Sequence, residues 1–144
     1  MTILLISGSR HATDLMQAYA VKCVQRALDN GWSLIAGDAI GVDALVARLV
    51  CPIQDDSAPD VLLTVYGIQD EPRNHAQGHH VAYKNIYDVQ QFGIHVTDYT
   101  TRDRYMVHVA DYVMCIWNGD SKGTKAVYEY AKEIGKQAWL KEFA

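Results

Sequence analysis

Short apolar runs alternate along the chain with stretches in which apolar residues recur every three or four positions. The runs ILLI, WSLIA, VLLTVY and YVMCIW are short and are bounded by polar or glycine-containing turns, as strands buried on both faces usually are. These predicted strands lie at residues 3–6, 32–36, 61–66 and 112–117. Weaker runs at 93–99 and 136–140 predict two further strands.

Three apolar stripes and one shorter segment predict helices over residues 15–28, 42–50, 126–134 and 103–110. Local chemistry supports the bounds of the first of these helices. Thr13 or Asp14 can cap its start, because a side-chain oxygen there accepts a hydrogen bond from a free backbone N–H. Asn30 and Gly31 can end it, because glycine readily adopts the left-handed conformation that often follows a helix.

Strands that alternate with helices predict right-handed crossovers and a mainly parallel sheet. We therefore expect an α/β fold, a Rossmann-like three-layer sandwich in which a doubly wound sheet carries helices on both faces. The whole chain, 1–144, is expected to form one domain. From 67 to 93 the periodicity fails, and we expect a long loop or lid there, with a helix near 81–91.

Three glycine-containing turns follow predicted strands. SGSR follows the first strand, GDAIGVD the second, and NGDSKGT the strand that ends at Trp117. Ligands of open α/β sheets bind outside the carboxyl ends of the strands, and those ends share one edge of a parallel sheet. The sequence therefore predicts that the three turns gather into one ligand site.

The turn WNGDSKGTK has the composition of an anion site at the start of a helix. The first N–H groups of a helix are unpaired and carry a partial positive charge, which suits phosphate or carboxylate. An ordinary capped helix, with Asp120 or Ser121 as the cap, is the alternative interpretation, and the spacing is not that of a Walker A loop. The predicted ligand residues of this turn are Trp117, Gly119, Ser121, Lys122, Gly123 and Thr124.

The other two turns contribute further candidates. Arg10 can bind a phosphate through two parallel N–H donors. Asp43, in the first turn of a helix, can accept hydrogen bonds from ribose hydroxyls or simply interact favourably with the helix dipole. Arg102 or Arg104 is expected to face the ligand while the other stays in solvent. Including these, the remaining predicted ligand residues are Gly8, Ser9, Arg10, Gly37, Asp38, Gly41, Asp43 and Arg102.

Composition narrows the classes of partner. The chain is 49% apolar and 21% charged, which is typical of a soluble globular protein. A net charge of −4 argues against sequence-independent nucleic-acid binding, which needs a broad Lys/Arg surface, so we predict no nucleic-acid partner. The start MTILLISGSR lacks a basic region and a long apolar run, so we predict neither a signal peptide nor a membrane partner. We expect a cytoplasmic protein whose three cysteines are reduced and buried.

His75, His79 and His80 lie in the segment predicted as a lid. His75 and His79 could share a helical face and bind a metal, but Gly78 interrupts that spacing and neither a cysteine nor a suitably spaced carboxylate lies near. We therefore predict lid histidines and no metal site.

The order of these motifs resembles the SLOG superfamily. The quoted elements are GSR near the start, the GDAIGVD turn, and the block R-D-x-x-M-V…A-D-x-V-x-x-x-W-x-G-x-S-x-G-T before the last helix. The superfamily includes the DNA-processing protein A family, the Lonely Guy phosphoribohydrolases and small YspA-like and YpsA-like proteins, and the chain is most similar to the YspA-like branch. The resemblance implies a Rossmann-like sheet, a nucleotide-type ligand at the glycine-rich turns, and a homo-oligomer.

Two departures from the superfamily pattern affect the expected chemistry. Asp38 stands where many relatives have a second glycine, and Ile40 stands where they have an arginine, so a phosphate ligand is missing at this turn. Glu129 lies two positions later than the glutamate of the phosphoribohydrolases, which is about 200° around a helix. The catalytic candidates are consequently Asp43 and Glu129, with Asp111 as a less suitable acid before a buried strand.

The sequence is compatible with four functions. We favour a module that binds a nucleotide or a nucleotide-derived phosphorylated ligand, as a sensor or for sequestration. The alternative is an N-glycoside hydrolase that acts on nucleoside monophosphates. A DNA-binding module and a domain with a vestigial pocket that serves only for assembly are the other two.

Overall fold

A six-stranded sheet runs through the computed structural model, which describes residues 1–54, 61–74 and 81–143. The strand order is β4-β3-β2-β1-β7-β8, and every neighbouring pair is parallel. The strands are β1 (Ile3–Gly8), β2 (Ser33–Ala36), β3 (Leu63–Gly67), β4 (Ala82–Asn85), β7 (Tyr112–Trp117) and β8 (Gln137–Glu142). The predicted parallel, doubly wound sheet is confirmed.

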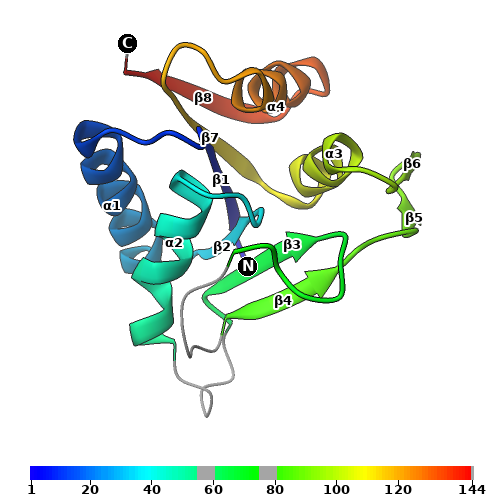
Figure 1. The fold of residues 1–144 in the computed structure, drawn as a ribbon, viewed down its shortest axis with the longest axis horizontal. Coiled ribbons are helices and arrows are strands. Elements are labelled where there is room, and N and C mark those ends of the chain that lie inside the picture. The colour runs from blue at the N-terminus through cyan, green and yellow to red at the C-terminus, as the bar shows by residue number, and fades with distance from the viewer. Residues whose placement is uncertain (55–60, 75–80, 144) are drawn as a thin grey trace.

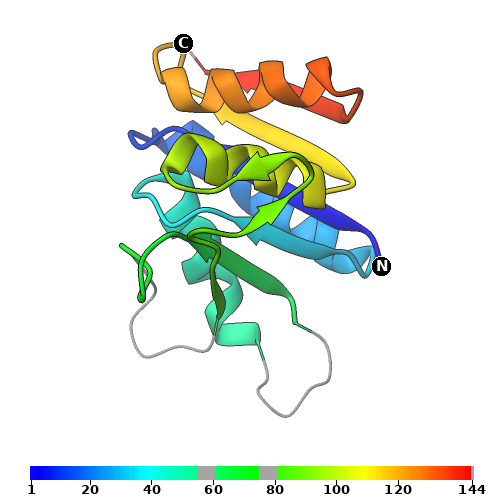
Figure 2. The same ribbon diagram turned by 90° about the vertical axis from the view of Figure 1, so that its right-hand side faces the viewer.

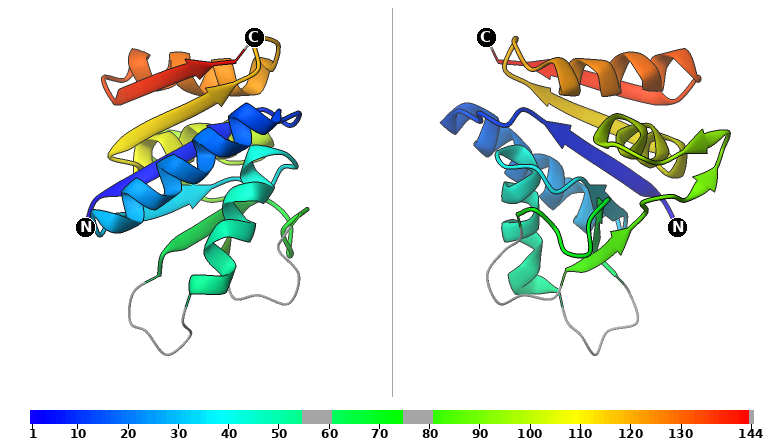
Figure 3. Two further views of the ribbon diagram at one scale, coloured as in Figure 1. Left: turned by 90° about the vertical axis from the view of Figure 1, so that its left-hand side faces the viewer. Right: turned by 45° about the vertical axis from the view of Figure 1, so that its right-hand side comes forward.

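Helices cover both faces of the sheet, which explains why its strands are apolar on both sides. Figures 1 and 3 show α1 (Asp14–Asp29) and α2 (Val42–Val50) on one face, and Figures 1 and 2 show α3 (Tyr99–Val109) and α4 (Lys122–Glu133) on the other. A short 3₁₀ helix, Cys51–Ile53, follows α2. Two apolar cores result, one around Met16 and Val46 and the other around Leu5 and Val107. This is the expected Rossmann-like three-layer sandwich.

Caps determine where two of the helices begin. Met16 N–H donates to Thr13 Oγ1 at 3.3 Å, so Thr13 caps α1 as the sequence allowed. The prediction that α3 begins at residue 103 is wrong, because Asp98 and Thr101 form a capping box and start the helix at Tyr99. The earlier start adds a turn of helix that brings Tyr99 and Arg102 to the candidate site.

Two predictions between residues 67 and 99 are wrong. Instead of a helix near 81–91, β4 extends the sheet beyond β3, because its backbone completes the otherwise free edge of that strand. The run 93–99 contributes only β6 (Ile94–His95), which pairs antiparallel with β5 (Gln90–Gln91) in a separate small sheet. The three lid histidines fall outside the described residues.

The order of the strands reverses at β1, which has β2 on one side and β7 on the other. The three glycine-containing turns follow these three strands and therefore meet at one edge, as predicted. Gly41 shows how closely the first two turns pack. Its φ is +81°, and a Cβ there would collide with the carbonyl oxygens of Ser9 and Arg10.

Candidate functional site

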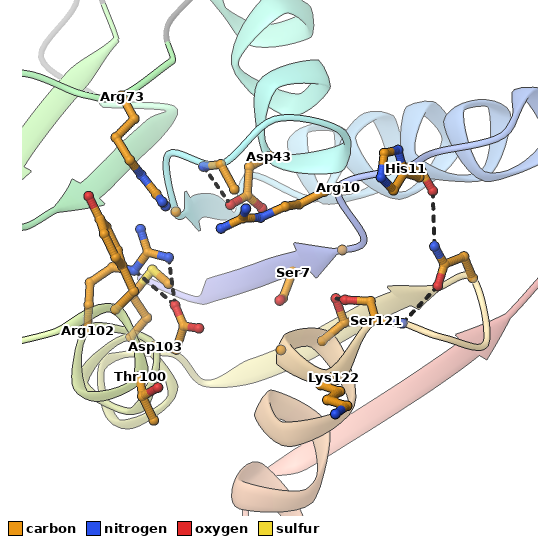
Figure 4. A pocket seen from close by; sticks show the side chains of 18 of the residues that line it. Ser7, Arg10, His11, Asp43, Arg73, Thr100, Arg102, Asp103, Ser121 and Lys122 are labelled. Atoms are coloured by element: carbon orange, nitrogen blue, oxygen red, sulfur yellow. Dashed lines mark hydrogen bonds and ion pairs between the residues drawn. The ribbon is translucent and has the colours of Figure 1, made fainter.

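A cleft of about 480 Å³ lies at the carboxyl ends of β1, β2 and β7 (Figure 4), within the size range of small-molecule sites. The turn after β1, the turn after β2 and the start of α4 each form part of its wall, and the beginning of α3 closes another side. From the first two turns and the segment after β3, its lining residues are Ser7, Gly8, Arg10, His11, Gly37, Ala39, Asp43 and Arg73. From α3 and the third turn they are Tyr99, Thr100, Arg102, Asp103, Met106, Asn118, Asp120, Ser121, Lys122, Gly123 and Thr124.

Arg102 organises the carboxylates of the cleft. Its Nη1 donates to Asp38 Oδ1 at 2.9 Å and to Tyr66 O at 3.1 Å. Its Nε and Nη2 lie 2.9 and 2.8 Å from Asp103 Oδ1. Arg102 is only 4% exposed, so most of its donors are already engaged by the protein. Its geometry is that of a positioning residue, whereas the exposed Arg104 stacks over Tyr130.

Asp38 holds a second arginine at the cleft. The Nε and Nη2 of Arg73 lie 2.9 Å from Asp38 Oδ1, and the Arg73 backbone N–H donates to Oδ2, also at 2.9 Å. Burial acts to raise the pKa of Asp38, but hydrogen bonds from Arg73 and the charges of Arg73 and Arg102 outweigh it and lower the pKa. Asp38 is therefore an ionised anchor, and it does not itself line the cleft.

The pKa of Asp43 is shifted in the opposite direction from that of Asp38. Burial raises the pKa of its carboxyl to about 7, with the charges of Asp103 and Asp38 acting in the same direction against the lowering effect of Arg102. Its Oδ2 accepts the Ala39 N–H at 3.2 Å, and its Oδ1 has no partner among the described residues. Asp43 thus presents to the cleft an oxygen whose protonation changes near neutral pH.

Asp103 is the third carboxyl around Arg102. Burial raises its pKa, although the adjacent guanidinium acts to lower it. Arg102 engages only Oδ1, so Oδ2 is without a protein partner in the part of the chain that the structure describes. The deep side of the cleft therefore combines guanidinium groups with carboxyl oxygens that can still accept hydrogen bonds.

The start of α4 forms the other side of the cleft. Ser121 occupies the N-cap position but makes no side-chain cap, whereas α1 and α3 are capped by Thr13 and Asp98. Its hydroxyl instead lies 3.2 Å from Thr124 Oγ1. Asn118 Oδ1 accepts the N–H groups of residues 120 and 121 and holds the turn in place. The first N–H groups of α4 are left without a side-chain acceptor, which suits an anion.

Several solved structures have a similar fold, whereas neither protein-family models nor the sequences of curated proteins give a match. Among solved structures, DNA processing protein A from Helicobacter pylori is similar with a TM-score of 0.66 and 16% identity, over 96% of this chain and 64% of that one. The chain thus spans less than two thirds of that protein. A molybdenum cofactor binding protein from Rippkaea orientalis has a TM-score of 0.70 and 17% identity, over 99% and 77%.

A third structure, the molybdenum cofactor carrier protein from Chlamydomonas reinhardtii, has a TM-score of 0.60 and 13% identity, over 99% and 77% of the two chains. These proteins share the architecture implied by the motifs. The chain shares this Rossmann-like α/β fold with them. At these identities the likeness concerns the fold, and the chemistry of the cleft has to be argued from its own residues.

The fold brings together most of the residues predicted from sequence. Those that line the cleft are Gly8, Arg10, Gly37, Asp43, Arg102, Ser121, Lys122, Gly123 and Thr124. Those that do not line it are Ser9, Asp38, Gly41, Trp117 and Gly119. Some of the second group support the turns: Ser9 Oγ accepts the Asn118 N–H at 3.1 Å, and Trp117 Nε1 donates to Ser121 O at 2.8 Å.

Two further acids have clear positions. Glu129 is exposed on α4 and does not line the cleft. Asp111 Oδ2 accepts the Ile3 N–H at 2.8 Å, which agrees with a structural role for this residue. Of the three acids considered as catalytic candidates, Asp43 alone lines the cleft.

The sequence did not indicate Arg73 and gave no role to Asp103, although both line the cleft. Arg73 lies in the segment after β3, with its guanidinium 3.5 Å from the centre of the Tyr99 ring. The Tyr99 hydroxyl is buried and makes no hydrogen bond within the described residues. Asp103 was noted only as part of a motif, although its place beside Arg102 was a usable signal. No local pattern pointed to Arg73, because its partner Asp38 is 35 residues away.

Among the described residues, no group of three or more His, Cys, Asp or Glu side chains is arranged to hold a metal ion. No described helix is long and apolar enough to cross a bilayer.

Proposed function

We propose that the cleft binds a nucleotide or a nucleotide-derived phosphorylated ligand, so that the protein acts as a sensor or a sequestering module. The observation that carries this proposal is the uncapped start of α4, which faces a cleft of about 480 Å³ beside the exposed Lys122. A phosphate there would accept hydrogen bonds from the first backbone N–H groups of the helix and from the Ser121 hydroxyl. Lys122 would add a charge-assisted contact.

The remainder of the ligand would lie toward α2 and α3. The free Oδ1 of Asp43 can accept a hydrogen bond from a ribose hydroxyl, and the buried Tyr99 hydroxyl can pair with a polar atom of the ligand. Arg73 lies in the part of segment 67–93 that precedes β4 and lines the cleft, which supports our proposal of a lid within this segment. We also propose that the chain forms a single domain that carries this lid.

The test is calorimetric titration of the full chain with nucleoside monophosphates, diphosphates and cyclic nucleotides. We expect at least one of them to bind, and Lys122→Gln to weaken that binding about tenfold through loss of a charge-assisted contact. Lys22→Gln, on the exposed face of α1 and outside the cleft, is the matched control and should leave the affinity unchanged. Failure of the whole panel to bind would remove the proposal.

A specific observation supports a second function, hydrolysis of an N-glycosidic bond in a nucleoside monophosphate. Asp43 lines the cleft, and burial raises its pKa to about 7, which suits a group that exchanges a proton with a reacting atom or a water molecule. Glu129 is not used in this proposal. Incubation with nucleoside monophosphates, followed by chromatography for the free base, tests it. Release of base that is lost in Asp43→Asn would support it, and a flat base signal would exclude these substrates.

A symmetric homo-oligomer also remains a proposal, made on the resemblance to the superfamily and on the frequency of symmetric association among small domains. Light scattering coupled to size-exclusion chromatography gives the mass in solution. A monomer mass across a wide range of protein concentrations would contradict it.

A further inference from the structure

We propose that Arg73, together with Arg10, forms a second anion-binding subsite across the cleft from the start of α4, so that the ligand carries two separate acidic groups. The inference rests on the proposed function and extends it from a phosphorylated ligand to one with a second phosphate, as in nucleoside diphosphates and bisphosphates.

The guanidinium of Arg73 is fixed in advance of binding. Nε and Nη2 are held at 2.9 Å by Asp38 Oδ1, and the face of the group lies on the Tyr99 ring. Its Nη1 has no acceptor among the described residues, and Figure 4 shows the group directed into the cleft. An arginine held on one edge loses little side-chain entropy when its other edge binds an acidic group.

Arg10 supplies the second cation. It is exposed, lines the cleft and makes no ion pair within the described part of the chain. In Figure 4 its side chain extends toward the side of the cleft that carries Arg73 and Asp43, whereas Ser121 and Lys122 lie on the other side. Two basic regions therefore face the same cleft from opposite walls, which favours two acidic groups over one.

The carboxyls around this subsite offset its positive charge fully only when all of them are ionised. The arginines there are Arg10, Arg73 and Arg102, and the acids are Asp38, Asp43 and Asp103, so with all groups ionised the charges balance. Burial raises the pKa of Asp43 to about 7, and its protonation leaves one positive charge in excess. Asp38 and Asp103 direct their bonded oxygens at Arg73 and Arg102, while Arg10 has no such partner.

The experiment compares the affinities of a nucleoside 5′-monophosphate, its 5′-diphosphate and its 3′,5′-bisphosphate for the full chain. We expect at least one of the two doubly phosphorylated compounds to bind about tenfold or more tightly than the monophosphate, as an added charge-assisted pair would give. In Arg73→Gln this ratio should fall toward one. Arg48→Gln, exposed on α2 outside the cleft, should keep the wild-type ratio.

A second variant covers the case in which Arg73→Gln fails to fold because Asp38 loses a partner. Arg10→Gln removes a side chain without an ion-pair partner, and we expect it to lower the same ratio. The inference is overturned if the wild type shows no preference for a second phosphate, or if neither variant changes the ratio. In both cases monophosphate binding would leave the proposed function standing, whereas failure of every nucleotide to bind would remove both.

Discussion

Asp43 is a buried acid whose protonation is linked to the stability of the fold. Because burial raises its pKa from 3.8 to about 7, the protonated carboxyl stabilises the native state below about pH 4. This contribution is lost as the pH rises through about 7, where the native carboxyl ionises. Asp43→Asn keeps an acceptor for the Ala39 N–H but cannot ionise. Between about pH 5 and about pH 8, the wild type should lose about 2–3 kcal/mol relative to this variant.

Urea unfolding of both proteins at the two pH values measures this difference. Asp29→Asn, exposed at the end of α1, is the matched control and should show no pH-dependent difference of this size. A stability difference between wild type and Asp43→Asn that stays constant with pH would mean that the carboxyl is already ionised in the native state at about pH 5.

Gly37 is required by the packing of the charged cluster. A Cβ at this position would lie 2.8 Å from both Arg102 Cζ and Asp43 Oδ2, closer than these atoms tolerate. Gly37→Ala should displace one of them and destabilise the protein by about 1–3 kcal/mol, with weaker ligand binding. Thermal and urea unfolding give the stability change. Gly123→Ala is the control for stability, because a Cβ there meets nothing within 4 Å and should not destabilise the helix.

At the scale of elements, the start of α4 lacks a stabilising side-chain cap at the place where we propose that a phosphate binds. Ser121 has the extended backbone of an N-cap residue but makes no side-chain cap. Ser121→Asp should cap α4 and stabilise the free protein by about 0.5–1 kcal/mol. The new carboxylate would occupy the N–H groups and repel a phosphate, so nucleotide affinity should fall by about tenfold or more.

Thr13→Asp places the same charge at the N-cap of α1, which does not line the cleft. Comparison of the two variants by calorimetry separates a local effect on the anion site from a change in net charge. Equal nucleotide affinity in Ser121→Asp and the wild type would show that the phosphate binds elsewhere.

Elements that depend on local pattern were predicted well from the sequence. Apolar runs located strands such as β1 and β7, because strands buried on both faces are apolar throughout. The stripe from Leu15 to Leu28 located α1, because a helix with one buried face has apolar residues every three or four positions. The start of α3 was missed because Asp98 and Thr101 close a capping box that the apolar pattern does not record. β4 was missed because an edge strand is fixed by backbone bonds to β3, and its own residues are mixed in polarity.

At the scale of the whole molecule, the gathering of three turns at one edge could be predicted, because parallel strands impose it. The identity of the cations in the cleft could not. The sequence indicated that Ile40 removes an arginine from the turn after β2, yet Asp38 in the same turn holds Arg73 there through a contact 35 residues distant. Arg102 was expected to face the ligand, but its donors are mostly engaged by Asp38, Asp103 and Tyr66.

The charge of the whole molecule gives a final prediction. DNA processing protein A, which has a similar fold, is described as binding single-stranded DNA. The present chain has a net charge of −4, and an extended polyanion would have to approach this surface without the counterion release that drives such binding. We expect a fluorescent single-stranded oligonucleotide to show no anisotropy change at about 150 mM salt, while a nucleotide still binds in the cleft.

Titration with the oligonucleotide at low and at physiological salt distinguishes nonspecific attraction from binding in the cleft. Lys22→Gln serves as a variant outside the cleft. Weak binding that disappears as salt is added would reflect nonspecific attraction to scattered lysines and arginines. Saturable binding that persists at physiological salt and is competed by a nucleotide would contradict the prediction. It would mean that the start of α4 and the Arg10–Arg73 wall bind successive phosphates of one strand, so that the two acidic groups inferred for the ligand belong to a polymer.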